Sequence, residues 1–214
     1  MGEVFDVYDE DERWIGTAER GDVHALGLWH RTFHCWLART GDDGEARVLF
    51  QLRSAGKDTN PGRYDITAAG HLVAGESPRD AVRELEEELG VAVGFEQLIA
   101  IGTVREHLEG TIAGRPYIDR EISDVYCCIS DWNLSSLRLQ EEEVAGVYEA
   151  RASELIALMR GEASELPARG VALHDGRLEA SDAIVTKADF VPRKDDYYID
   201  VFHRLAELAG RASP

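Results

Sequence analysis

The clearest alternation of apolar and polar positions lies between residues 77 and 90, where it has the period of a helix. Three apolar residues recur at spacings that place them on one face: Val82, Leu85 and Leu89. Ser77 is a favourable N-cap residue, and Asp80, three positions later, completes a capping-box pattern. Gly90 follows the last apolar position, where helices commonly end in a left-handed residue. The pattern therefore predicts an amphipathic helix that begins at Ser77 and ends before Gly90.

The stretches on either side are shorter, and most of them have the alternation or the apolar runs of strands. Strands are expected within residues 4–14, 48–54, 65–71, 97–110 and 119–130. Helical spacing returns in residues 153–159, and Phe202, Leu205 and Leu208 indicate a final amphipathic helix. A polar connection is expected from Gly170 up to that last helix. Because no repeat and no low-complexity linker interrupts the chain, residues 1–214 are expected to form a single domain with an N-terminal hairpin and a C-terminal helical extension.

The composition narrows the class of partner. The chain has 214 residues, of which 44% are hydrophobic and 30% are charged, as in soluble globular proteins. A formal net charge of −18 at pH 7 argues against a nucleic-acid polymer or an anionic membrane as a partner, but not against a small phosphorylated substrate. The sequence has no apolar run of membrane-spanning length and no signal-peptide pattern. Cys35, Cys127 and Cys128 lack paired metal-ligand spacing, so buried thiols in a cytoplasmic protein are expected.

The predicted helix carries an unusual group of charges on its polar side. Glu84, Glu87 and Glu88 are spaced at i, i+3 and i+4, so their carboxylates share one face. Like charges this close repel one another, and the helix gains no stability from them. A divalent cation that prefers oxygen ligands removes the repulsion, and Mg²⁺ is the usual choice beside phosphates. The spacing therefore predicts a metal site on this face.

The segment from Gly70 to Val91 resembles the Nudix box, a signature written G-x5-E-x7-R-E-U-x-E-E-x-G-U, where U is a bulky aliphatic residue. Every named position is filled: Gly70, Glu76, Arg83, Glu84, Leu85, Glu87, Glu88, Gly90 and Val91. The spacer after Glu76, from Ser77 to Val82, is one residue shorter than in the signature. Either the helix begins one residue later, or Glu76 is rotated by roughly 100° away from the carboxylate face.

The resemblance implies an α/β (α+β) fold in which a mixed β-sheet is sandwiched between α-helices. It also implies a metal-dependent hydrolase that cleaves the diphosphate bond of a nucleoside diphosphate linked to another group. The carbonyl of Gly70 and the carboxylates of Glu84, Glu87 and Glu88 would hold Mg²⁺ or Mn²⁺. Arg83 lies four positions before Glu87 and would orient it through a salt bridge.

A second resemblance is to the isopentenyl-diphosphate isomerase-like branch of the Nudix superfamily. One phrase of that branch is reproduced by Trp29, His30, Arg31, His34 and Trp36. The resemblance to this branch implies that Arg53 and Lys57 hold the substrate diphosphate and that His24 and His30 line the pocket. It also implies that Glu121 lies opposite the box. Asp119, on the same strand face as Glu121, is a weaker candidate. His34 is expected in the core.

Two features separate the chain from the isomerases, which depart from the R-E-U-x-E-E pattern that is complete here and differ at the position before Gly70. The isomerases carry a catalytic cysteine just before the Gly-His pair, where this chain has Ala69 before Gly70 and His71. Because alanine cannot protonate or deprotonate an allylic carbon, hydrolysis is favoured over isomerisation. The general base stays open between Glu84 and Glu121. An isomerase-like enzyme and a non-catalytic ligand-binding domain remain as alternatives, and the resemblance also leaves a homodimer open.

Overall fold

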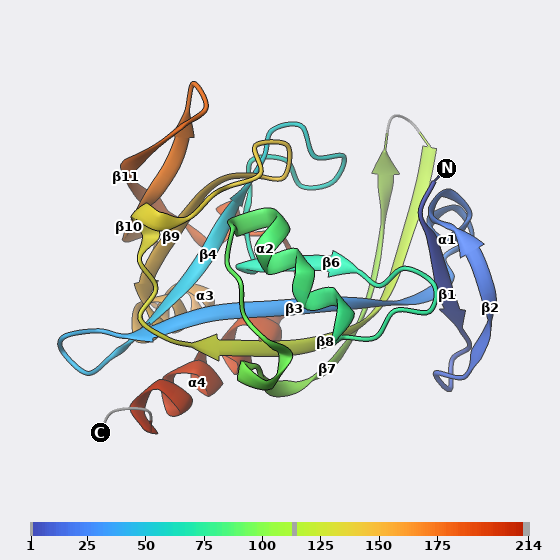
Figure 1. Cartoon of the computed structure of the whole chain (residues 1–214), viewed down its shortest axis with the longest axis horizontal. Helices are drawn as coiled ribbons and strands as arrows, with labels where there is room; N and C mark the ends of the chain where they lie inside the picture. The colour runs from blue at the N-terminus through green and yellow to red at the C-terminus, as the bar shows by residue number, and fades with distance from the viewer. Residues whose placement is uncertain (1, 113–114, 212–214) are drawn as a thin grey trace.

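The computed structural model describes residues 2–112 and 115–211. Its strands form one mixed sheet, with a main path that runs β11-β10-β9-β4-β3-β1-β2 (Figure 1). The strands are β1 (Val4–Tyr8), β2 (Trp14–Glu19), β3 (Trp29–Thr40), β4 (Ala46–Arg53), β5 (Tyr64–Asp65), β6 (Ala68–His71), β7 (Ile99–Ile112), β8 (Arg115–Ile129), β9 (Val144–Arg151), β10 (Leu166–His174) and β11 (Arg177–Val185). The α-helices are α1 (Arg20–Leu26), α2 (Arg83–Leu89), α3 (Ala152–Arg160) and α4 (Asp195–Arg211).

Strand β3 organises the sheet. It runs parallel to β8 and antiparallel to β1, β4 and β6. The register places His71 of β6 opposite Thr32, and it places Glu121 of β8 opposite His30. Residues far apart in the sequence are thereby brought side by side at one end of β3.

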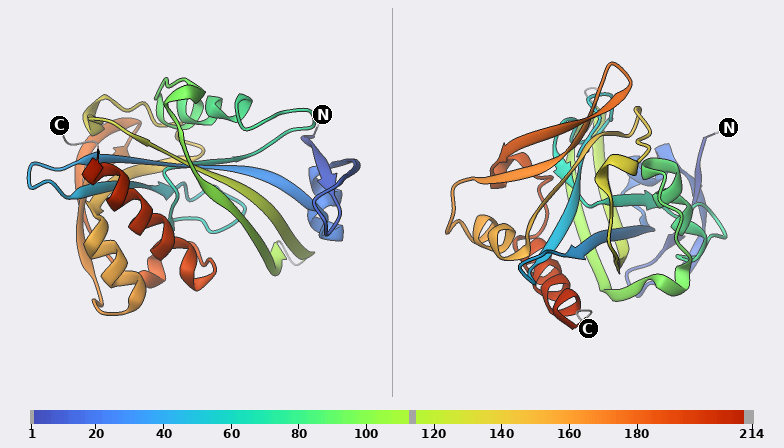
Figure 2. Two further views of the ribbon diagram at one scale, coloured as in Figure 1. Left: turned by 90° about the horizontal axis from the view of Figure 1, so that it is seen from below. Right: turned by 60° about the vertical axis from the view of Figure 1, so that its left-hand side comes forward.

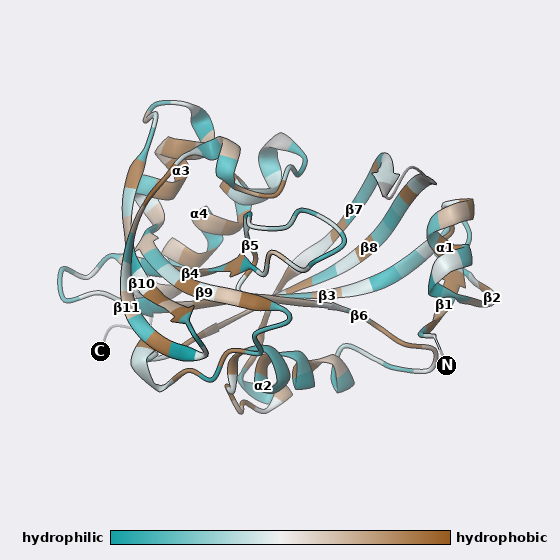
Figure 3. Cartoon of the chain, turned by 90° about the horizontal axis from the view of Figure 1, so that it is seen from above, coloured by the Kyte–Doolittle hydropathy of each residue, from teal (hydrophilic) through white to brown (hydrophobic). Residues whose placement is uncertain are grey.

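Helices cover both faces of the sheet. The helix α2 lies on one face, and α3 and α4 lie on the other (Figures 2 and 3). Leu85 packs with Phe33 in the core under α2, while Trp36 and Phe202 belong to the larger core under α3 and α4. The ribbon of α2 is largely hydrophilic in colour, because its polar side carries the acidic residues (Figure 3). The predicted fold class, a mixed sheet between α-helices, is confirmed.

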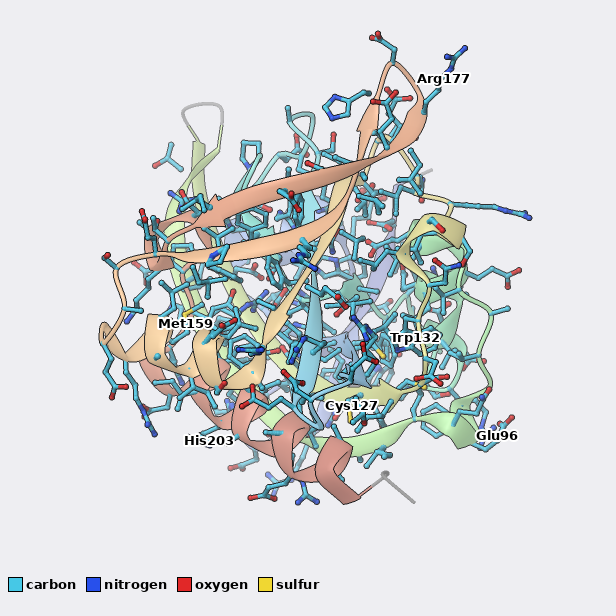
Figure 4. The ribbon with its side chains drawn as sticks, turned by 90° about the vertical axis from the view of Figure 1, so that its left-hand side faces the viewer. Glu96, Cys127, Trp132, Met159, Arg177 and His203 are labelled. Atoms are coloured by element: carbon cyan, nitrogen blue, oxygen red, sulfur yellow. The ribbon has the colours of Figure 1, made fainter. Side chains whose placement is uncertain are left out.

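Most of the expected elements are found. Residues 153–159 lie within α3, and Phe202 and Leu205 are buried on α4. The three cysteines are buried as free thiols, with Cys127 labelled in the interior (Figure 4). None of the helices in the described ranges is long and apolar enough to cross a membrane.

The prediction of a polar connection that begins at Gly170 is wrong. Strands β10 and β11 form an antiparallel hairpin that pairs from Leu166↔Val185 to His174↔Arg177. The hairpin turns at Asp175 and Gly176, whose φ angles are 50° and 71°. Positive φ at both central residues is typical of a two-residue hairpin loop, and Asp-Gly is its usual sequence. The exposed polar side chains of β11 obscured the strand pattern, and the Asp-Gly pair is the signal that was missed.

The helix of the Nudix-like segment begins later than predicted. A turn at residues 78–79 and a 3₁₀ turn, Asp80–Val82, precede α2, which begins at Arg83. The Asp80 carboxylate accepts hydrogen bonds from the Ser77 backbone N–H at 2.9 Å and from the Ser77 hydroxyl at 2.7 Å. The capping interaction therefore closes this entry turn instead of the α-helix. We call residues 80–89 the box helix.

The buried face of the box helix agrees with the predicted stripe. Leu85 and Leu89 are fully buried, and Val82 is 9% exposed. At the other end, Gly90 has a φ of 69°, in the left-handed conformation expected after the last helical residue. The packing of this stripe fixes which side of the box helix faces the solvent and the site.

Candidate active site

A cleft of about 530 Å³ is lined by the box helix, β6, the loop after β4, β8 and the segment before α4. Almost all of its side chains are charged or polar. Among the described residues, aliphatic side chains reach the cleft only from Ala69, Leu108 and Val191. A cleft of this kind suits a highly polar ligand.

The box-helix carboxylates meet β6 at Gly70. A Cβ atom on Gly70 would lie 2.5 Å from the carboxyl carbon of Glu84, so no larger residue fits there without a shift. Glu88 is only 5% exposed, and its Oε2 is buried without a hydrogen-bond partner among the described residues. Burial raises the pKa of Glu88 to about 8 and that of Glu84 to about 7.

These observations test whether the site suits a metal. Burying a carboxylate that lacks a partner is costly unless a cation compensates it. Glu84, Glu88 and the backbone of Gly70 supply the oxygen donors that Mg²⁺ and Mn²⁺ prefer, and Glu87 lies on the same side, also lining the cleft. The donor set fits a hard divalent cation.

Arg83 contacts three of the four glutamates of the box. Its guanidinium donates to Glu76 at 3.1 Å, to Glu84 at 2.6 Å and to Glu87 at 3.0 Å. Glu76 also accepts a hydrogen bond from the Val73 backbone N–H at 2.9 Å. Glu76 therefore contacts Arg83 despite the short spacer.

A second cluster of polar side chains includes His71 of β6. It consists of three histidines and two carboxylates: His24, His30, His71, Asp119 and Glu121. The ligand atoms of His24, His30 and His71 lie within 4.8 Å of one another, as do those of His30, Asp119 and Glu121. Asp119 Oδ1 is 3.6 Å from Nε2 of both His24 and His30, and Glu121 Oε1 is 3.7 Å from His71 Nε2. Among the described residues, the three Nε2 atoms and Asp119 Oδ1 are buried without hydrogen-bond partners.

The histidine tautomers favour metal binding at this cluster. Nδ1 of His24 lies 2.9 Å from the Arg20 carbonyl, and Nδ1 of His30 lies 3.1 Å from the Leu28 carbonyl. A carbonyl only accepts, so Nδ1 carries the proton and Nε2 presents its lone pair to the cluster. Burial lowers the pKa of both His30 and His71, which keeps the rings neutral. Sequence reasoning placed His24 and His30 at the pocket but missed His71, which directly follows Gly70.

Arg53 and Lys57, the two cationic side chains predicted to hold the substrate diphosphate, both interact with other groups of the protein. The Arg53 guanidinium donates to the Thr59 carbonyl at 2.9 Å and to Asp65 at 3.2 Å, so it braces the loop after β4. Lys57, at the cleft, forms an ion pair with Glu143 of the acidic loop before β9. His34 is 2% exposed and bonded to the Tyr197 hydroxyl at 3.0 Å, which is the expected core position.

Several further cleft residues were not predicted from the sequence, and Arg20, Asp65, Tyr117 and Arg193 are among them. They come from α1, β5, β8 and the segment before α4, and none of them belongs to a motif. Only the sheet topology brings them to the same place, so no local pattern in the sequence identifies them.

Comparison with known proteins decides the family. Residues 28–168 match the family profile of the NUDIX domain. The chain belongs to the Nudix family. The matched range contains the complete box, the second cluster except His24, and the loop with Arg53 and Lys57.

The sequence similarity between this Nudix chain and its relatives extends over most of its length. It is 37% identical to an uncharacterised Nudix hydrolase of Clostridium acetobutylicum over 206 residues, which is 96% of this chain and 98% of that protein. It is 33% identical to an isopentenyl-diphosphate Delta-isomerase of Streptomyces coelicolor, over 71% of this chain and 73% of the isomerase. The crystal structure of DR0079 from Deinococcus radiodurans matches with a TM-score of 0.55 at 19% identity, over 74% of this chain and 90% of that chain, which supports the fold alone.

Proposed function

We propose that this Nudix chain is a metal-dependent hydrolase that cleaves the diphosphate bond of a nucleoside diphosphate linked to another group. The observation that carries the proposal is the buried Oε2 of Glu88, which has no hydrogen-bond partner within residues 2–112 and 115–211 and shares the cleft with Glu84 and Gly70. The assigned ligands are the Gly70 carbonyl, Glu84, Glu87 and Glu88, with Mg²⁺ or Mn²⁺ as the cation. When bound, this cation neutralises phosphate oxygens and lowers the pKa of water.

Other side chains orient the metal ligands, bind the substrate and serve as candidates for the general base. Arg83 holds Glu84 and Glu87 in one orientation through its two hydrogen bonds. Lys57 leaves Glu143 and binds the far phosphate as a point charge. Arg53 keeps the loop that carries Lys57 in place through its bonds to Thr59 and Asp65. Glu84 and Glu121 are the two candidates for the general base.

The second cluster is assigned a divalent cation of its own. Its imidazole and carboxylate donors suit a first-row transition ion better than Mg²⁺ alone. His30 therefore acts in this cluster and not as a direct substrate contact. The whole chain, residues 1–214, is proposed to work as one domain, since α1 carries His24 of the second cluster and the segment before α4 reaches the cleft.

An isomerase is the second candidate, favoured by the histidine cluster and by relatives with that name. Two features argue against it. Ala69 supplies no group for proton transfer, and the described residues of the cleft form no apolar wall of the kind that a hydrocarbon chain needs. A non-catalytic binding domain is the third candidate, and its main support was the short spacer. The contact between Glu76 and Arg83 removes much of that support.

A substrate panel tests the proposal. Nucleoside di- and triphosphates, dinucleoside polyphosphates and nucleotide sugars are incubated with the protein and Mg²⁺ or Mn²⁺, and isopentenyl diphosphate is assayed for isomerisation. We expect turnover of at least one nucleotide and none of isopentenyl diphosphate. Isomerisation alone would support the second candidate, and binding without turnover would support the third.

A further inference from the structure

Tyr117 of β8 lies beside the second cluster and contacts two of its members. Its hydroxyl donates to Oδ2 of Asp119 at 2.7 Å. Its ring stacks on the imidazole of His24, with 4.8 Å between the ring centroids and 21° between the ring planes. Tyr117 lines the cleft, yet it has no role in the proposed hydrolysis. It therefore touches one carboxylate and one imidazole of the set assigned to the second cation.

The local fold brings Tyr117 to both partners. Tyr117 and Asp119 are separated by one residue on β8, so their side chains project from the same face of the sheet. The residue between them, Ile118, packs against the end of α1, since a Cβ atom on Gly27 would lie 2.6 Å from Cγ2 of Ile118. Gly27 has a φ of 63° and ends α1. Because α1 is held this close to β8, His24 comes within stacking distance of Tyr117.

The two carboxylate oxygens of Asp119 have different surroundings. Oδ1 lies 3.6 Å from Nε2 of both His24 and His30, and it is buried without a hydrogen-bond partner among the described residues. Oδ2 accepts the hydroxyl of Tyr117. An ionised carboxylate only accepts, so the phenol carries the proton in this bond. Tyr117 thus engages one oxygen of Asp119 and leaves the other to face the histidines.

Burial of a phenol does not by itself explain this arrangement. A buried tyrosine hydroxyl usually finds a partner, but any nearby acceptor satisfies it. Here the acceptor is a carboxylate of the cluster, and the same side chain also packs on the His24 ring. Residues that bond to metal ligands orient those ligands, and their loss typically weakens metal binding by about 10- to 100-fold.

The hydrogen bond from Tyr117 also limits how Asp119 can bind a cation. While Oδ2 is bonded to the hydroxyl, Asp119 supplies a single oxygen, and chelation through both oxygens would break that bond. Ca²⁺ takes about six to eight oxygen ligands and often binds both oxygens of one carboxylate. Imidazole ligands suit first-row transition ions. Binding through one oxygen of Asp119 therefore favours a transition ion over Ca²⁺.

We propose that Tyr117 is a positioning residue of the second cluster, which turns Oδ1 of Asp119 toward His24 and His30 and holds Asp119 to binding through one oxygen. The inference rests on the second cation of the proposed function. It adds a residue that belongs to no motif, and it assigns to the Tyr117 hydroxyl the preference of the cluster for a transition ion over Ca²⁺.

Cobalt binding tests the role of Tyr117 without catalysis. The full chain is titrated with Co²⁺ in excess Mg²⁺, the visible absorption of imidazole-bound Co²⁺ is followed, and competition with Ca²⁺ gives the preference between the two ions. Tyr117→Phe removes the hydroxyl and keeps the ring on His24. We expect it to raise the Kd for Co²⁺ at least about tenfold and to leave the Kd for Ca²⁺ unchanged or lower. His24→Asn removes one imidazole and identifies the absorption that belongs to the second cluster.

Tyr126→Phe is the matched control. Tyr126 lies on the same strand, but its ring contacts Phe33 and Phe95 in the core under α2. Loss of its hydroxyl should leave the Kd for both ions unchanged. Thermal unfolding in EDTA confirms that each variant is folded at the temperature of the titration.

The outcomes separate the inference from the function on which it rests. Equal Co²⁺ binding by wild type and Tyr117→Phe would overturn the inference and leave the second cation in place. Equal losses for Co²⁺ and Ca²⁺ would also overturn it, since the hydroxyl would then not select the ion. A wild type without imidazole-bound Co²⁺ would overturn the second cation and the inference together. A Tyr117-dependent Co²⁺ site in a protein that hydrolyses no nucleotide would sustain the inference and overturn the proposed hydrolysis.

Discussion

At the scale of single residues, the candidate site is marked by buried polar atoms that have no hydrogen-bond partner in the described part of the chain. Glu88 Oε2 at the box helix and the Nε2 atoms of the histidine cluster are the main examples. Leaving such atoms unpaired costs more than a hydrogen bond contributes on average. These atoms therefore point to ligands that complete their bonding, and their burial distinguishes the site from a solvent-exposed acidic surface.

Glu88→Gln tests the box-helix site. The amide removes one charged oxygen ligand, so kcat should fall by at least ~10²-fold, about 2.7 kcal/mol. In EDTA, the unfolding temperature should stay equal or rise, because an uncompensated buried carboxylate has been removed. Glu86→Gln is the matched control, since Glu86 is exposed on the same helix and should change kcat by less than about twofold. Steady-state kinetics and thermal unfolding provide both readouts, and wild-type turnover in Glu88→Gln would refute the metal-site assignment.

His34 gives a prediction about pH. Its Nδ1 accepts from the Tyr197 hydroxyl, which itself accepts from Trp36, and burial holds the pKa of His34 well below its ordinary value of 6.5. The unfolded chain then binds a proton more readily than the folded protein. The stabilising contribution is fully present above pH 6.5 and is lost as the pH falls below it.

The measurement compares wild type with His34→Asn, which keeps an acceptor near Nδ1 but does not titrate. Between pH 7 and pH 5, about one and a half units below the ordinary pKa, the unfolding temperature of wild type should fall more steeply than that of the variant. Parallel curves for the two proteins would show that His34 is not the titrating group.

At the scale of elements, the box helix shows how a sequence pattern and its structure diverge. The stripe of Val82, Leu85 and Leu89 fixed the orientation of the helix correctly, because burial of an amphipathic face depends on spacing alone. The start of the helix was misplaced, since Ser77 and Asp80 satisfy each other in a turn instead of capping α2. Helix ends depend on local hydrogen bonds that spacing does not specify.

Inserting one alanine between Ala81 and Val82 tests the role of the short spacer. The native chain already holds Glu76 against Arg83, so restoring the family spacing should bring no advantage. We expect kcat/KM to change by less than about tenfold, or 1.4 kcal/mol. A gain of several orders of magnitude would show that the native site is degenerate and would favour the binding-domain alternative.

The loop after β4 is tested through Lys57. If Lys57 binds the far phosphate equally in the ground and transition states, Lys57→Ala should raise KM about tenfold and leave kcat nearly unchanged. Arg177→Ala is the control for a lost positive charge, because Arg177 lies at the tip of the β10–β11 hairpin (Figure 4). A change in kcat alone would place Lys57 at the leaving group instead.

At the scale of the whole molecule, the cleft depends on connections that the sequence pattern does not reveal. The family resemblance anticipated the mixed sheet between helices and the box carboxylates, because both follow from local signatures. Arg193 and Asp65 lie 128 positions apart in the sequence, yet they share an ion pair. The two residues meet because the segment before α4, residues 186–194, crosses β5. The residue spacing of neither segment predicts this crossing. The closeness of Asp119 and His71 was not predicted for the same reason, since their strands β8 and β6 both pair with β3.

The proposed function requires that water attack a diphosphate bond at the metal site of the box helix. The most direct measurement uses ¹⁸O-labelled water with the best nucleotide substrate and Mg²⁺, followed by mass spectrometry of both products. We predict one ¹⁸O atom in the phosphate of one product per turnover, and loss of the labelled product in EDTA and in Glu88→Gln. Label-free products, labelled products that form equally without divalent metal, or no cleavage of any nucleotide in the panel would contradict the claim.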